Sequence, residues 1–274
     1  MTEWNASAYA RQSSLQQAMA EEQLGLLTLE GTERVLDVGC GDGKITAEIA
    51  ARVPRGSVVG VDPSRDMVAF ASSHFGPPAQ ANLRFEVADV RRLPYRDEFD
   101  LVVSFNALHW VPEQGLALGS IRAALRPGGR ALLRLVPQGR RKCLEDVIEE
   151  VCRRPRWAGY FRGFQKPYVH FTPEEYRALA EHCGFQVLRL RVEDKAWDFK
   201  TREAFVAFCR ATTVEWTRCL PESEWQAFIT EFLDLYQAVA ADSPQEANTF
   251  KFYQMEVTLT PALTSASPGP PSGA

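Results

Sequence analysis

The sequence predicts an α/β protein with a doubly wound, mostly parallel sheet of seven strands. Apolar runs alternate with helix-like segments through the first half of the chain, which indicates a parallel sheet with helices on both faces. The runs at 58–62, 101–105 and 131–136 are apolar almost throughout, as expected for strands that are covered on both sides. A loop with glycine at every second position directly follows the first run.

The elements of the first half follow in chain order. Strands are expected at 34–38, 58–62, 83–87, 101–105 and 131–136. Ser64 can cap a helix after the second strand, because its hydroxyl can accept a hydrogen bond from a free backbone N–H. Leu116 and Ile121 mark the apolar face of the helix before the fifth strand, and the turn at 127–129 enters that strand.

The second half predicts two more strands with helices inserted between them. A helix near 144–152 leads into an irregular segment that is dense in aromatic residues. Thr172 then begins a well-marked helix, with proline at the first position and acidic residues in the first turn. A sixth strand at 185–192 and a last strand at 252–260 are separated by helical stretches at about 201–218 and 221–240.

We expect a single domain over residues 1–260, with a helical lid that is rich in aromatic residues. The lid segments are about 153–171 and 200–241, and aromatic residues recur at helical spacing in the second of them. Residues 261–274 are rich in proline, serine, glycine and alanine, a composition typical of a disordered tail.

The composition argues against several kinds of partner and site for this protein. The chain has 274 residues, a formal net charge of −4 and no long basic block, which argues against a nucleic-acid partner. No segment has the length and apolarity of a membrane span or a signal peptide, so we expect no membrane partner and a cytoplasmic location. The six scattered cysteines form no C-x-x-C pair, so we expect reduced thiols and no metal site.

Residues 35–43 predict a nucleotide site. A buried strand, a glycine loop and the start of a helix follow one another here, and glycine lets the backbone approach a ligand closely. The helix start adds free backbone N–H groups. Lys44 stands where the dinucleotide-binding fingerprint needs a third glycine or an alanine, so a nicotinamide-dependent oxidoreductase is disfavoured.

The chain resembles the class I S-adenosylmethionine (SAM)-dependent methyltransferases, whose motif D/E-x-G-x-G-x-G is matched here by Asp37, Gly39, Gly41 and Gly43. The resemblance implies a Rossmann-like methyltransferase fold and SAM as the cofactor, with Gly39, Cys40 and Gly41 beside it. It also implies that Asp37 orients the loop or reaches the ligand amine through water. The alternatives are an ordinary turn in another α/β protein and a purely structural Asp37.

The same resemblance implies roles for polar residues at three further strand ends. Asp62 would accept hydrogen bonds from the ribose hydroxyls, and the alternative is an aspartate that only caps a helix. Asp89, followed by Val90, would bind the adenine amino group, and the alternative is an exposed loop residue. Asn106 would lie beside the methionine part of SAM, with its backbone carbonyl facing the ligand amine.

Two narrower resemblances concern the methyl acceptor. Segments 4–9 and 108–110 resemble trans-aconitate methyltransferases, and the whole arrangement, including 14–16 and 42–46, resembles insect juvenile hormone acid methyltransferases. Both relatives methylate carboxylates, so the resemblance implies a small carboxylic acid as the substrate. A carboxylate has a pKa of about 4 and is already a nucleophile at neutral pH, so its methylation needs no general base.

Gln16, His109 and Trp110 are the candidates for holding that carboxylate through N–H donors. The alternatives are an exposed helix residue at Gln16, a structural histidine at His109 and a wall of the core at Trp110. The runner-up reaction methylates a hydroxyl, an amine or a carbon, and His109 would then act as a base. A rival from another class is a SAM- or nucleotide-binding domain without turnover.

Two features of the lid point to different kinds of acid substrate. A tricarboxylate needs several convergent arginines, and the lid offers Arg153, Arg154, Arg156 and Arg162. Its aromatic residues instead favour an acid with an apolar tail. Because an aromatic stripe at helical spacing is also typical of a core, the lid leans toward a hydrophobic acid without settling the choice.

Overall fold

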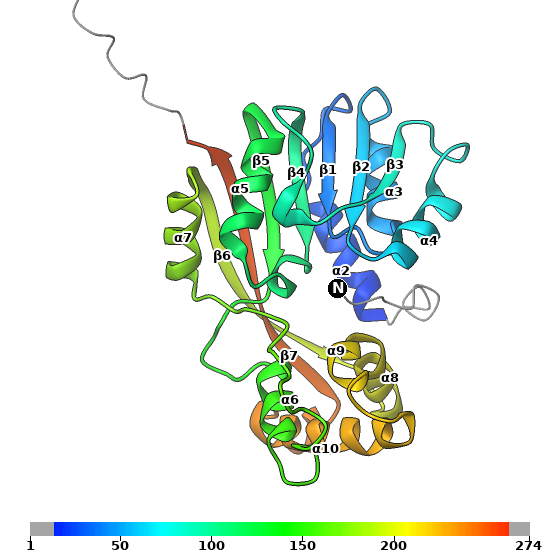
Figure 1. The fold of residues 1–274 in the computed structure, drawn as a ribbon, viewed down its shortest axis with the longest axis vertical. Coiled ribbons are helices and arrows are strands. Elements are labelled where there is room, and N and C mark those ends of the chain that lie inside the picture. The colour runs from blue at the N-terminus through cyan, green and yellow to red at the C-terminus, as the bar shows by residue number, and fades with distance from the viewer. Residues whose placement is uncertain (1–13, 263–274) are drawn as a thin grey trace, which may run out of the picture.

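The computed structural model describes residues 14–262, and it excludes the side chains of residues 14, 16 and 17. Its centre is a seven-stranded sheet with the strand order β3-β2-β1-β4-β5-β7-β6 (Figure 1). β7 runs antiparallel to both of its neighbours, β5 and β6, whereas the pairings among β1 to β5 are parallel. The predicted doubly wound, mostly parallel α/β fold is confirmed.

The seven strands are β1 (Arg34–Val38), β2 (Ser57–Asp62), β3 (Leu83–Val87), β4 (Phe99–Phe105), β5 (Leu125–Leu135), β6 (Phe185–Asp198) and β7 (Thr249–Pro261). The helices are α2 (Ser14–Gly25), α3 (Lys44–Arg52), α4 (Arg65–Phe75), α5 (Gln114–Ala124), α6 (Leu144–Cys152), α7 (Pro173–His182), α8 (Arg202–Thr212), α9 (Val214–Thr217) and α10 (Glu222–Ala240). Three short 3₁₀ turns complete the described elements, at η1 (Val90–Arg92), η2 (Leu108–Trp110) and η3 (Pro244–Glu246).

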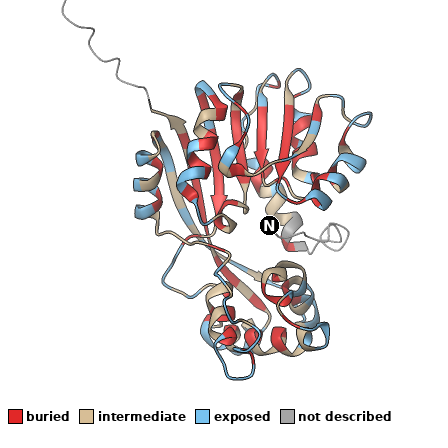
Figure 2. Cartoon of the chain, in the orientation of Figure 1, coloured by how far each residue is buried: buried red, intermediate tan, exposed pale blue. Residues whose placement is uncertain are grey.

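Both faces of the sheet are covered, because successive side chains of a strand point to opposite sides. Leu36 packs into the apolar cluster under α5 and α7, whereas its neighbour Val35 packs into the cluster under α2 and α3. Figure 2 shows the resulting band of buried residues along the strands. The central strands are therefore largely apolar, because both faces of the sheet are covered by helices.

Two helix starts follow from local chemistry. The Ser64 hydroxyl accepts a hydrogen bond from the Met67 N–H at 3.3 Å and caps α4. Thr172 and Glu175 form a reciprocal capping box at the start of α7, with Pro173 at the first helical position. Both starts lie where the sequence predicts them.

Two strands differ from their expected bounds. β5 begins at Leu125, because the predicted entry turn is a bulge within the strand, and its pairing with β4 shifts register between Phe99 and Leu101. β6 continues from the expected end at 192 to Asp198. The extra residues alternate between half-buried and exposed positions and remain paired with β7, so the extension is part of a two-stranded ribbon.

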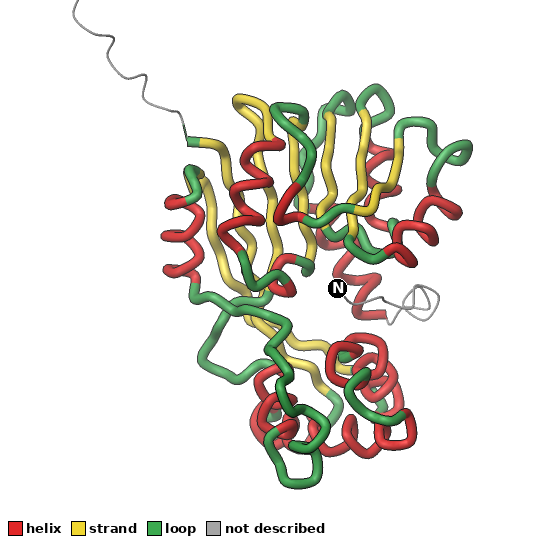
Figure 3. Tube along the Cα trace, in the orientation of Figure 1, coloured by secondary structure: helices red, strands yellow, loops and turns green. Residues whose placement is uncertain are grey.

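The β6–β7 ribbon extends beyond the sheet and carries the helical lid. β5 pairs with β7 only opposite Met255–Leu259, whereas β6 stays paired as far as Thr249. Figures 1 and 3 show α6, α8, α9 and α10 gathered at this far end. They share one aromatic cluster with Leu15 of α2, and it includes Trp157 and Trp216. α6 thus packs with the lid, although the predicted lid segments begin at 153.

Within the described part of the chain, no helix is both long and apolar enough to cross a membrane. All six cysteines are free thiols.

The predicted disordered tail lies outside the described residues from 263 onward, and its first residue, Pro261, ends β7. Segment 4–9, one source of the narrower resemblance, also lies outside them.

Candidate functional site

The glycine loop after β1 is bent tightly against the end of β2. The backbone N–H groups of Gly39 and Cys40 both donate to the Val61 carbonyl, at 2.8 and 3.1 Å. Gly39 has a φ of 76°, and a Cβ atom there would lie 2.2 Å from the Cβ of Ala107. This position needs glycine for packing, because Ala107, in the segment after β4, lies directly against the loop.

Gly41 needs glycine for a different reason. Its φ is 53°, yet a Cβ atom there would meet no non-neighbouring atom of the described residues within 4 Å. The position therefore faces open space at the carboxyl end of the sheet, where ligands of doubly wound folds bind. Gly39 closes the loop onto the protein, and Gly41 leaves it open toward a ligand.

Asp62 ties the end of β2 to this loop. Its carboxylate accepts from the N–H of Gly41 at 3.1 Å and from the N–H of Ser64 at 2.9 Å. The cap of α4 is Ser64 itself, so Asp62 is not the capping residue. A carboxylate oxygen can accept more than one hydrogen bond, so these two backbone bonds do not by themselves preclude the predicted ribose contacts.

Asp37 lies beneath the loop. Its carboxylate is buried and accepts a hydrogen bond from the Thr46 hydroxyl of α3 at 2.7 Å. Burial, and to a smaller extent the nearby Asp62, raises the pKa of Asp37 to about 7. This bond joins β1 to α3 across the loop, an arrangement that suits the predicted role of orienting the loop.

The predicted adenine end is a hollow at the carboxyl ends of β2 and β3. It is lined by Pro63, Glu86, Val87, Ala88, Asp89, Arg92 and Pro94. Asp89 forms an ion pair with Arg91 at 2.7 Å. The hydrogen bond and positive charge of Arg91 hold the pKa of the Asp89 carboxyl below its usual range. The side chain of Val90 is buried in the core, so Val90 can offer a ligand only its backbone.

Asn106 follows β4 with a φ of 57°, in the left-handed region that asparagine tolerates. Its N–H donates to the Arg134 carbonyl at 2.8 Å. Its side-chain oxygen accepts from Gln254 of β7 at 3.0 Å. Hydrogen bonds to residues of β5 and β7 thus hold Asn106 in this conformation.

His109 and Trp110 lie on η2 at the entrance to the lid. His109 is 4% exposed, and its Nδ1 has no hydrogen-bond partner among residues 14–262. Burial, with a smaller contribution from His170, lowers the pKa of His109 to about 3, so its ring is neutral at pH 7. Trp110 packs edge-on against Trp216 at 6.0 Å between ring centroids. Gln16 lies on α2, and its side chain is outside the described residues.

The lid aromatics form a core more than a pocket wall. Trp157, Trp216 and Phe228 are fully buried and pack with Phe161 and Phe164. This matches the alternative in which aromatic residues at helical spacing fill a core.

The lid arginines do not converge on one site. Arg154 pairs with Glu231 at 2.9 Å, and Arg156 pairs with Glu224 at 3.0 Å, both with exposed guanidinium groups. Arg153 and Arg162 are exposed as well. These four residues therefore lack the arrangement that a tricarboxylate needs.

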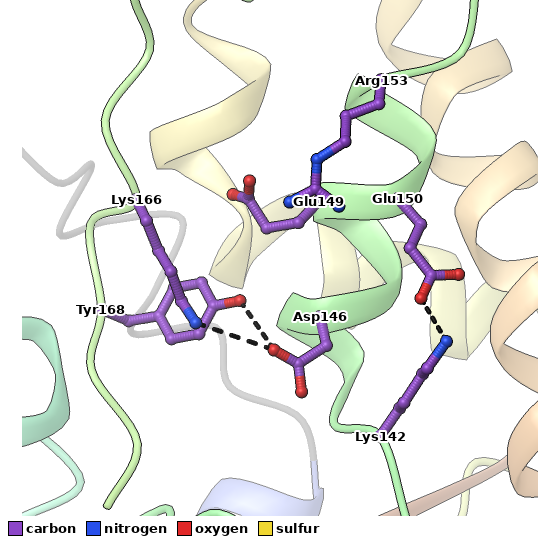
Figure 4. Close-up of a pocket in the computed structure, with 7 residues that line it drawn as sticks. All are labelled: Lys142, Asp146, Glu149, Glu150, Arg153, Lys166 and Tyr168. Atoms are coloured by element: carbon purple, nitrogen blue, oxygen red, sulfur yellow. Dashed lines mark hydrogen bonds and ion pairs between the residues drawn. The ribbon is translucent and has the colours of Figure 1, made fainter.

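A second hollow lies on the lid and is lined by charged residues that pair with one another. Figure 4 shows Asp146 facing the Tyr168 hydroxyl at 3.1 Å and the Lys166 ammonium at 3.8 Å. Lys142 pairs with Glu150 on the other side. Because these charges pair with one another, we interpret this hollow as a solvated surface. It differs in this respect from the open space beside the glycine loop.

The comparisons with known proteins agree with this geometry. A model described as "Methyltransferase domain" matches residues 35–129. The chain is 28% identical over 256 residues to trans-aconitate 2-methyltransferase of Delftia acidovorans, over 88% of this chain and 93% of the relative. Among solved structures, it is similar to Haemonchus contortus phosphoethanolamine N-methyltransferase 2 bound to S-adenosylhomocysteine. That match has a TM-score of 0.60 and 17% identity, over 93% of this chain and 57% of that one.

The predicted resemblance to the class I SAM-dependent methyltransferases is confirmed. Its cofactor is SAM, as the glycine motif predicts. The resemblance to trans-aconitate methyltransferases is also confirmed, and the one to juvenile hormone acid methyltransferases stays a prediction. The fold alone does not fix the reaction, since the [4+2]-cyclase SpnF shares it with a TM-score of 0.59 at 18% identity, over 95% of this chain and 87% of that one.

The methyltransferase also has polar residues near the site that the sequence did not single out. Gln254 of β7 reaches Asn106, and Arg134 of β5 pairs with Glu22 of α2 at 2.9 Å. Lys195 of β6 pairs with the same Glu22. Of these residues, only Arg134 could have been noticed in the sequence, because it is a basic residue inside the otherwise apolar fifth strand.

Proposed function

We propose that this methyltransferase transfers the methyl group of SAM to the carboxylate of a small organic acid and forms a methyl ester. The observation that carries the proposal is the burial of His109, whose pKa of about 3 makes it a poor base at neutral pH. A carboxylate acceptor needs no base, whereas a hydroxyl acceptor does. The 28% identity to a trans-aconitate 2-methyltransferase supports the same acceptor class.

The residues at the carboxyl ends of β1 to β4 suit the cofactor. Gly41 leaves space beside the loop, and Asp62 presents its carboxylate to that space. In our proposal Asp62 binds the ribose, Asp89 and the Val90 backbone border the adenine, and Asn106 lies beside the methionine part. SAM supplies an activated methyl group on a positively charged sulfur.

The acceptor would be held where the lid meets the sheet. In our proposal His109, Trp110 and Gln16 orient the carboxylate, with the neutral His109 ring as an N–H donor. A carboxylate oxygen then bonds to the methyl carbon while the carbon–sulfur bond breaks, which leaves the ester and S-adenosylhomocysteine. The main contributions of the protein are alignment and exclusion of water. The free thiols suit the reducing cytoplasm, where we place the reaction.

A labelling experiment tests the proposal. The full chain is incubated with methyl-labelled SAM and a pool of metabolite acids, and the products are identified by mass spectrometry. Mild alkali should release the label as methanol, because esters hydrolyse in base. An Asp62→Ala variant purified in the same way and run at limiting SAM controls for label transferred by contaminating proteins.

The other outcomes identify the alternatives. Label that survives alkali would point to methylation of a hydroxyl, an amine or a carbon. A folded protein that binds SAM but labels nothing in any pool would support a binding domain without turnover. Either result overturns the carboxylate proposal.

A further inference from the structure

Arg134 is a buried cation with unused donors. It is the second-last residue of β5, and its side chain is 1% exposed. Its Nη2 donates to Glu22 at 2.9 Å, whereas Nε and Nη1 have no hydrogen-bond partner among the described residues. Leaving buried donors of a charged group unpaired is costly, so these N–H groups are suited to an anionic ligand.

Among the described residues, the ion-pair network that includes Arg134 has one more cation than it has carboxylates. Ion pairs link Glu22 to Arg134 and Lys195, and the network continues along the ribbon through Glu193, Arg191, Glu256 and Arg189. These residues comprise four cations and three carboxylates. Burial opposes the ionisation of Glu22, but its two cationic partners outweigh burial and lower the pKa of Glu22. Glu22 therefore stays charged and still does not neutralise the network.

The position of Arg134 connects it to the reaction site. Its carbonyl accepts from the N–H of Asn106, the residue that follows β4. Gln254 bridges the same place, because its Nε2 donates to both Asn106 and the Leu135 carbonyl. The Gln254 Oε1 is buried and, within residues 14–262, has no partner. The unused donors of Arg134 and the unused acceptor of Gln254 thus belong to two residues that both bond to Asn106 at the ends of β4 and β5.

We propose that Arg134 forms a carboxylate-binding subsite at the ends of β4 and β5, with Lys195 adding positive charge. Two sources can supply the carboxylate. One is the amino-acid end of SAM, whose ammonium group would suit the Gln254 oxygen. The other is the methyl acceptor, and this source alone rests on the proposed function. In both cases the N–H groups of Nε and Nη1 donate to the carboxylate oxygens.

Equilibrium binding to the full chain tests the subsite without requiring turnover. S-adenosylhomocysteine is compared with 5′-methylthioadenosine, which lacks the amino-acid end. Octanoate is compared with octanol in protein saturated with S-adenosylhomocysteine. The variants are Arg134→Met, Arg134→Lys, which keeps the charge, and Glu22→Gln, which removes the internal competitor.

If the cofactor supplies the carboxylate, Arg134→Met should weaken S-adenosylhomocysteine binding about 10- to 100-fold and leave 5′-methylthioadenosine unchanged. If the acceptor supplies it, S-adenosylhomocysteine affinity stays constant, and octanoate binding falls while octanol binding does not. In either case Arg134→Lys should retain part of the affinity, and Glu22→Gln should not weaken binding.

The subsite is overturned if Arg134→Met changes neither comparison. Should Arg134→Met fail to fold, the double variant Glu22→Gln/Arg134→Met removes both charges of this ion pair and is subjected to the same titrations. An unchanged result there overturns the proposal equally. The labelled-product experiment is independent of this outcome, so the subsite and the carboxylate acceptor can fail separately.

Discussion

The carboxylate of Asp62, at the end of β2, accepts a hydrogen bond of 3.1 Å from the backbone N–H of Gly41 in the loop after β1. This bond places an acidic group at the edge of the space that Gly41 leaves open. The two residues are 21 positions apart, and the parallel pairing of β1 with β2 brings them together. The first prediction follows from this relationship.

Asp62→Ala should weaken SAM binding by about 1.5–3 kcal/mol, the range for hydrogen bonds to a charged group. The variant loses the predicted ribose contacts and the bond that steadies Gly41. Isothermal titration calorimetry measures the effect, and Asp234→Ala, which removes an exposed lid carboxylate paired with Arg202, is the matched control. Unchanged affinity in Asp62→Ala would show that the cofactor lies elsewhere.

Alanine substitutions at Gly39 and Gly41 should separate packing from ligand binding. Gly41→Ala should fold with a modest loss of stability, because its Cβ meets no described neighbour but its φ of 53° is strained for alanine. It should weaken SAM binding at least about tenfold by occupying ligand space. Gly39→Ala should lower the melting temperature, because its Cβ would overlap Ala107. Thermal melts and SAM titrations of both variants distinguish the two effects. Normal SAM binding by a folded Gly41→Ala protein would contradict the assignment of the loop.

Asp37 should make the protein less stable as the pH rises. Its pKa is about 7 in the folded state and about 3.9 when unfolded, so the folded state holds more protons between these values. The stability that Asp37 contributes is full below pH 4 and is lost as the pH rises through 7. Relative to Asp37→Asn, which can still accept from Thr46, wild-type unfolding free energy should fall by about 3 kcal/mol from pH 5 to pH 8.

Urea denaturation of both proteins across this range measures the Asp37 effect. The comparison with Asp37→Asn cancels the titration of the other groups. Parallel stability curves would mean that the carboxyl is already ionised at pH 5.

His109→Gln should retain most of kcat and mainly raise KM. The neutral ring of His109 can donate a hydrogen bond but is a poor base at neutral pH, and glutamine keeps a donor. The wild-type kcat should also show no rise between about pH 6.5 and 9, because no proton leaves a carboxylate acceptor. The pH profile and the variant are measured on the acceptor that the labelling experiment identifies.

A different kinetic pattern would favour the runner-up reaction. If His109 were a general base, His109→Gln should lose about 100-fold or more in kcat. A profile rising through pH 7 together with such a loss would reject the carboxylate acceptor.

The sequence by itself determined the sheet, the glycine loop and the cofactor class. These features depend on residues that are close in the chain. Val35 and Leu36 alternate because neighbouring strand residues face opposite sides, and Ser64 caps α4 through an N–H three residues later. The end of each strand then places Asp62, Asp89 and Asn106 along one edge of the sheet.

Only the tertiary structure decided the contacts that cross the molecule. Glu22 and Arg134 are 112 positions apart, and Asn106 and Gln254 are 148 apart, so no local pattern couples them. Their meeting depends on β7 being inserted antiparallel between β5 and β6 and on α2 bringing Glu22 to the end of β5. The neutrality of His109 is equally tertiary, because the cost of charging a side chain depends on the burial around it.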